Sequence, residues 1–116
     1  MTLADPPLAI EEAQFHERRF RRRFPLSFPL EYAGKSERDS TFGLGRTLDV
    51  SSSGVRFLAE RPLAAGMQLS IAIDWPRALA DGVPLRLVLS VEVVRAGGRE
   101  AAAKIYQYEF RTRRPR

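Results

Sequence analysis

The chain has 116 residues, of which 44% are hydrophobic and 28% charged, values that are typical of one globular domain with a single core. It has no cysteine, which excludes a disulfide framework, a thiolate metal site and a cysteine nucleophile. The net charge is +5, and nine of the 19 basic residues are arginines in two clusters, at residues 18–23 and 111–116. Outside these clusters, ten basic residues are outnumbered by 14 acidic ones. This concentration of positive charge indicates a localised anion site.

The N-terminal part of the sequence lacks a regular apolar pattern. Pro6 and Pro7 interrupt residues 1–9, and we expect residues 1–17 to form a flexible N-terminal lead-in. Residues 10–22 contain neither glycine nor proline, so a short helix or an arm can form there. The start is acidic, and no apolar run approaches the roughly 20 residues of a membrane span, so we expect a cytoplasmic protein without membrane contact.

Apolar and polar residues alternate from Phe24 to Tyr32, and this period of two predicts a half-buried strand. Pro25 and Pro29 lie on one face of it and cannot donate ladder hydrogen bonds, which indicates an edge or bulged strand. Five further strands are predicted at about Thr41–Val50, Gly54–Ala59, Met67–Trp75, Leu85–Val93 and Ala102–Phe110. Breaks with glycine or proline separate several of them, at Pro62–Gly66, Pro76–Pro84 and Gly97–Gly98. Six short strands spaced in this way are typical of a closed or nearly closed antiparallel barrel or sandwich.

Catalysis and metal binding are poorly supported, because His16 is the only histidine. A Ser-His-Asp triad would have to use it, yet no Gly-x-Ser-x-Gly segment occurs in the sequence. Zinc sites need several histidine or cysteine ligands, which this chain cannot supply. We therefore expect no enzyme and no metal or other cofactor, and we interpret His16 as a surface residue.

The segment Arg18–Arg23 places five guanidinium groups at close spacing, just before the first predicted strand. Guanidinium is planar, permanently charged and a bidentate donor, so it suits phosphates and the O6 and N7 edge of guanine. A solvated cluster that aids solubility is an equally good interpretation of this segment alone.

The segment Asp49–Gly54 (Asp-Val-Ser-Ser-Ser-Gly) lies between two apolar runs. Asp and Ser side chains bond to nearby backbone in turns, and glycine can take a positive φ without steric cost. By itself, this segment is best interpreted as a plain connection between strands.

Taken together, in this order and with about 25 residues between them, the two segments resemble the PilZ domain family. That family carries an Arg-x-x-x-Arg motif just before its first barrel strand and an Asp/Asn-x-Ser-x-x-Gly motif on a following turn. Asp49, Ser51 and Gly54 match the second motif. The first can be read in two frames, and the frame that ends at Arg23 is preferred because that residue directly precedes the strand.

The resemblance implies a small six-stranded antiparallel barrel within a domain of residues 18–116, with a flexible or partly helical N-terminal arm that closes over cyclic di-GMP. The ligand-binding residues that it implies are Arg18, Arg19, Arg22, Arg23, Asp49, Ser51 and Gly54. The arginines would contact phosphates and guanine edges, while the aspartate would accept from guanine N1 and N2. The serine would hydrogen-bond the ligand, and the glycine would allow close backbone approach.

The resemblance further implies a bacterial second-messenger receptor that is not an enzyme. It would signal through an effector protein, because ligand binding orders the arm and changes a protein–protein contact. Two alternatives remain open. One is a small barrel that binds nucleic acid through its basic arm, although nucleic acid is not expected as a partner because the middle of the chain is net acidic. The other is a PilZ-like adaptor that does not bind the nucleotide.

Overall fold

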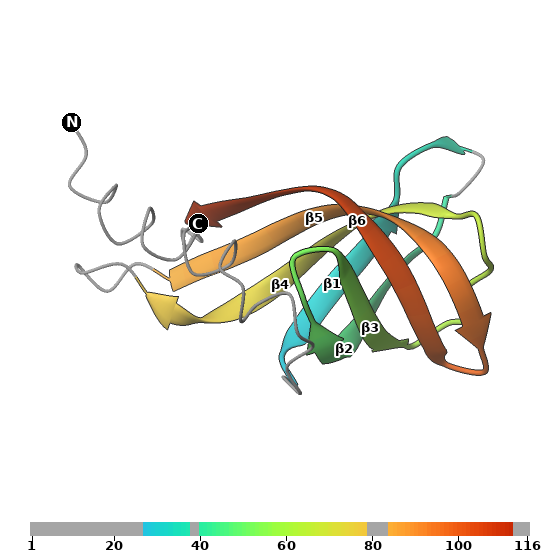
Figure 1. Cartoon of the computed structure of the whole chain (residues 1–116), viewed down its shortest axis with the longest axis horizontal. Helices are drawn as coiled ribbons and strands as arrows, with labels where there is room; N and C mark the ends of the chain where they lie inside the picture. Colours follow the sequence, from blue (N-terminus) through green and yellow to red (C-terminus); the bar gives the residue numbers. More distant parts are fainter. Residues whose placement is uncertain (1–26, 38–39, 79–83, 113–116) are drawn as a thin grey trace.

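In the computed structural model, residues 27–37, 40–78 and 84–112 are described, and nearly all of their regular structure is β-strand. The strands are β1 (Pro29–Gly34), β2 (Phe42–Val50), β3 (Gly54–Ala59), β4 (Gln68–Ala78), β5 (Pro84–Gly97) and β6 (Glu100–Thr112). Every neighbouring pair is antiparallel, and the order β1-β2-β3-β6-β5-β4 closes on itself (Figure 1). The predicted six-stranded barrel is therefore confirmed. No helix among the described residues has the length and apolar character that a membrane span requires.

Alternation of side chains builds the core of the barrel. In β5, every second side chain from Leu85 to Val93 is fully buried, and the side chains between them are half-buried on the outer face. The matching alternation in β4 buries Leu69, Ile71 and Ile73. These two strands and β6 are the longest of the barrel, and Figure 1 shows them extending past β1, β2 and β3 on one side. The period of two that predicted these strands is thus the pattern that fills the barrel.

The first strand differs from its prediction. It begins at Pro29, whereas residues 24–26 lie outside the described residues and Phe28 is not in a strand. The predicted edge or bulged character is wrong, because β1 pairs without a register shift with both β2 and β4. Pro29 is the first residue of the strand, a position that proline tolerates. Phe28 donates its N–H to Thr47 Oγ1 at 2.8 Å and accepts from Thr47 N at 2.9 Å, which fixes the entry into the barrel.

The fourth strand continues past the predicted break at Pro76. It ends at Ala78, and its register with β5 shifts between Trp75 and Ala78. A bulge leaves backbone groups out of the ladder, so it can accommodate a residue without an N–H. Trp75 packs against Phe28 and Phe110, with ring centroids 5.9 Å and 5.5 Å apart, so this irregular stretch remains tied to the core.

Candidate functional site on the outer face of β2 and β3

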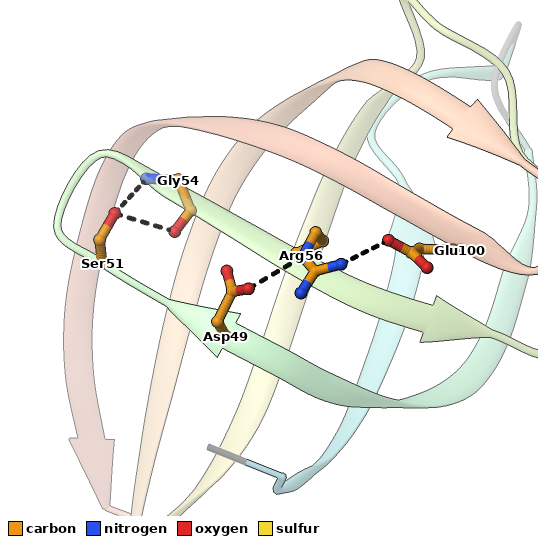
Figure 2. Close-up of polar contacts among 5 residues, drawn as sticks. All are labelled: Asp49, Ser51, Gly54, Arg56 and Glu100. Atoms are coloured by element: carbon orange, nitrogen blue, oxygen red, sulfur yellow. Dashed lines mark hydrogen bonds and ion pairs between the residues drawn. The ribbon is translucent and has the colours of Figure 1, made fainter. Parts of the chain in front are cut away.

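The turn between β2 and β3 is held closed by the hydroxyl group of Ser51. Its Oγ accepts from the N–H groups of Gly54, at 3.1 Å, and Ser53, at 3.3 Å, and it lies 3.3 Å from the carbonyl oxygen of Gly54 (Figure 2). The backbone N–H of Ser51 also donates to that carbonyl, at 2.8 Å. Ser51 is only 2% exposed. Its hydroxyl therefore bonds within the turn, as expected of serine in a connection between strands.

Gly54 is a buried strand residue. It begins β3 and pairs with Lys104 of β6. Among the residues that the structure describes, a positive φ occurs only at Gly66 and Gly98, so Gly54 does not use the conformational freedom that glycine offers in a turn. Its contribution to the turn is its buried backbone, in which both the N–H and the carbonyl group hydrogen-bond to Ser51.

A row of three charged side chains crosses the outer face next to this turn (Figure 2). Asp49 Oδ2 of β2 accepts from Arg56 Nε of β3 at 2.8 Å, and Arg56 Nη1 donates to Glu100 Oε2 of β6 at 2.7 Å. The Asp49 side chain is only 10% exposed, whereas that of Arg56 is 38% exposed. Hydrogen bonds from the guanidinium to Asp49, and then to Glu100, raise the pKa of Arg56 above its ordinary value. Arg56 therefore stays charged, and its guanidinium fixes one oxygen of the Asp49 carboxylate.

Arg56 and Glu100 are not among the residues predicted from the sequence. Arg56 lies directly opposite Asp49 in the register of β2 and β3, after a shift between Thr47 and Asp49. Its position two residues after Gly54 makes it an outward residue of β3, which the alternation with Val55 could have indicated. No local signal could have found Glu100, because it comes from β6 and meets Arg56 only through the closure of the barrel.

Not every predicted ligand residue can be placed. Arg18, Arg19, Arg22 and Arg23 lie outside the described residues. The described chain begins at Ser27, whose Oγ and carbonyl oxygen accept from Arg46 Nε at 3.1 Å and Arg46 Nη2 at 3.0 Å. Arg46 belongs to β2, the strand that leads to Asp49. The structure therefore brings Asp49, Ser51 and Gly54 together at one turn and holds Ser27 beside the same strand.

The outer face also has a hollow of about 350 Å³ next to this row. It is lined by the β5–β6 hairpin, from Arg95 to Gly97 and from Glu100 to Ala102. Within the described ranges, no group of three His, Cys, Asp or Glu side chains is placed to hold a metal ion. The available groups are hydrogen-bond acceptors and donors on an open surface, which suit the recognition of a polar ligand.

The structure is a small closed barrel with a polar turn between β2 and β3, and comparison with known proteins gives its family. The PilZ domain model matches residues 16–115, so the chain belongs to the PilZ domain family. PilZ domains are known as cyclic di-GMP receptors and are binding or adaptor domains.

Among solved structures, the crystal structure of the PilZ domain of CeSA from a cellulose synthesizing bacterium is similar, with a TM-score of 0.56 and 23% identity. The match covers 74% of this chain and 81% of that chain. At this identity, the likeness shows a shared fold. Among curated proteins, no sequence matches the chain.

Proposed function

We propose that this protein is a cyclic di-GMP receptor in which Asp49 recognises a guanine base. The observation that carries the proposal is the Asp49 carboxylate at the motif turn of a PilZ barrel, fixed on the outer face by Arg56. Guanine presents two adjacent donors, N1–H and N2–H, and a carboxylate is the side chain that accepts from both at once. An oriented carboxylate at this position is therefore suited to a guanine edge.

In this proposal, Ser51 acts through the turn. A hydroxyl has one proton and two acceptor sites, and Ser51 Oγ already has partners for all of them in Ser53 and Gly54. A direct bond to the ligand would break one of these contacts. The serine therefore shapes the turn that holds Asp49 beside β3, and Gly54 contributes the buried backbone on which the turn closes.

The arginines before the barrel supply the second half of the proposed site. Arg23 is four positions before Ser27 along the chain, so their Cα atoms lie within about 14 Å of each other whatever the conformation. Arg19 and Arg23, or Arg18 and Arg22 in the other frame, would donate to the phosphates and to guanine O6 and N7. Ligand binding would order this segment against the barrel, and an effector protein would read the new surface.

Asp49→Ala tests this proposal. We expect it to weaken cyclic di-GMP binding by about 1.5–3 kcal/mol, the usual contribution of a hydrogen bond to a charged group. Asp74→Ala is the matched control, because Asp74 also pairs with an arginine, Arg86, at 3.2 Å, but between β4 and β5. Isothermal titration calorimetry gives the dissociation constants, and circular dichroism with thermal melting reports folding.

The proposal predicts that the Asp74→Ala protein binds as the unchanged protein does. If the Asp49→Ala protein is folded and its dissociation constant is unchanged, Asp49 does not recognise guanine. Equal losses in the two variants would show that the effect comes from the stability of the barrel and not from contact with the ligand.

A further inference from the structure

Arg56 connects side chains of three strands next to the turn. It uses two different nitrogens, Nε for Asp49 and Nη1 for Glu100, so its guanidinium is held at both ends. Glu100 is about half exposed, whereas Asp49 is almost covered. The three groups come from β2, β3 and β6, and an arginine with two partners has less rotational freedom than one with a single partner.

We propose that Arg56, anchored by Glu100, is a positioning residue that fixes the orientation of the Asp49 carboxylate and thereby sets the preference of the site for guanine. This inference rests on the proposed function. It assigns a role to two residues outside the sequence motif.

The chemistry of guanine recognition explains why orientation matters. The two donors of guanine lie in the plane of the base, so a carboxylate accepts from both only when its own plane is aligned with that of the base. The last torsion of an aspartate side chain is broad, so little in the side chain itself selects this alignment. A guanidinium donor at Oδ2 supplies the restraint, and a carboxylate has about four lone-pair sites, so this contact is compatible with acceptance from a base.

The barrel contains a matched pair for comparison. Arg86 of β5 donates to Asp74 Oδ1 of β4 from Nε, at 3.3 Å, and from Nη2, at 3.2 Å. Its side chain is 28% exposed, close to the value for Arg56. Strands β1 and β6 separate this pair from β2 and β3 in the barrel. Arg86→Ala thus removes the same kind of ion pair at a distance from the turn.

The test measures two affinities for each protein, one for cyclic di-GMP and one for its inosine analogue, which lacks the exocyclic N2 amine. We expect the unchanged protein and Arg86→Ala to prefer cyclic di-GMP by about tenfold, the scale of one lost hydrogen bond. Arg56→Ala should weaken cyclic di-GMP binding by about tenfold and reduce the preference to about twofold. Glu100→Gln should have an affinity and a preference between those of the unchanged protein and those of Arg56→Ala.

The ratio of affinities separates positioning from stability, because a general loss of structure weakens both ligands alike. Folded Arg56→Ala protein with the full preference overturns the inference, whatever its absolute affinity. If Arg56→Ala does not fold, Glu100→Gln decides, and an unchanged preference in that variant overturns the inference. If the unchanged protein binds neither ligand, the proposed function fails and this inference fails with it.

Discussion

Replacing Ser51 with alanine tests whether its hydroxyl holds the turn between β2 and β3. The change removes one acceptor that is 3.1 Å from Gly54 N and 3.3 Å from Ser53 N, together with a donor 3.3 Å from Gly54 O. Gly54 is buried, so its N–H loses a partner where water does not easily replace it. A buried group left without its hydrogen bond costs about 1–3 kcal/mol, so we expect Ser51→Ala to destabilise the protein by that amount.

Thermal melting followed by circular dichroism measures this loss. For a domain of roughly this size, each 1 kcal/mol lowers the melting temperature by about 4–8 °C. Ser52→Ala is the control, because Ser52 lies in the same turn and takes part in none of these bonds. If Ser51→Ala and Ser52→Ala have the same melting temperature, the hydroxyl of Ser51 does not hold the turn. Lost cyclic di-GMP binding with unchanged melting would instead show that Ser51 contacts the ligand directly.

Three further predictions concern other parts of the molecule. Gly43→Ala should destabilise the barrel by about 1–3 kcal/mol in urea unfolding, because its Cβ would lie 2.3 Å from the hydroxyl oxygen of the fully buried Tyr32. Tyr106 donates to the Glu92 carboxylate, and this hydrogen bond raises the pKa of the phenol, so Glu92→Gln should lower the pH at which Tyr106 ionises. The stabilisation from this bond is present below the pKa of unfolded tyrosine and is lost as pH rises through the folded value. A short single-stranded oligonucleotide should not bind saturably at physiological salt, whereas the nucleic-acid alternative predicts a log-log salt slope near −0.7 per phosphate contact.

Each of these predictions has a result that would contradict it. Unchanged unfolding of Gly43→Ala would mean that Tyr32 does not fill the space beside that glycine. Ultraviolet titration of tyrosinate, with Tyr106→Phe as the control, would show no shift in Glu92→Gln if the hydrogen bond were not the cause. Salt-dependent oligonucleotide binding without a cyclic di-GMP response would favour the nucleic-acid alternative.

The sequence predicted the strands whose signal is local. Alternation from Leu85 to Val93 identified β5, because each inward side chain contributes to a core that needs apolar groups at every second position. The character of β1 could not be predicted in this way. Prolines usually indicate an edge, but whether a strand has two neighbours depends on the closure of the barrel, and Pro29 occupies the one position in β1 where its missing N–H does no harm.

The site was predicted only in part, because some of its residues are close in the sequence and others meet only in the folded barrel. Asp49, Ser51 and Gly54 lie within six residues of one another, and their resemblance to a known motif located the turn. Arg56 required the register of the β2–β3 hairpin, which includes a shift after Thr47. Glu100 required the pairing of β3 with β6, a contact between residues that are 44 positions apart. The residues that lie close together in the sequence could therefore be predicted, whereas Arg56 and Glu100 become visible only in the folded barrel.

The central claim is that this PilZ barrel is a receptor for cyclic di-GMP, and a calorimetric titration of the full chain tests it most directly. Cyclic di-GMP should bind saturably in the micromolar range or tighter. GTP and GMP should bind far more weakly, because only the dinucleotide offers two guanines, one to the Asp49 turn and one to the arginines before the barrel. No saturable heat with cyclic di-GMP, or equal affinity for GTP, would contradict the account.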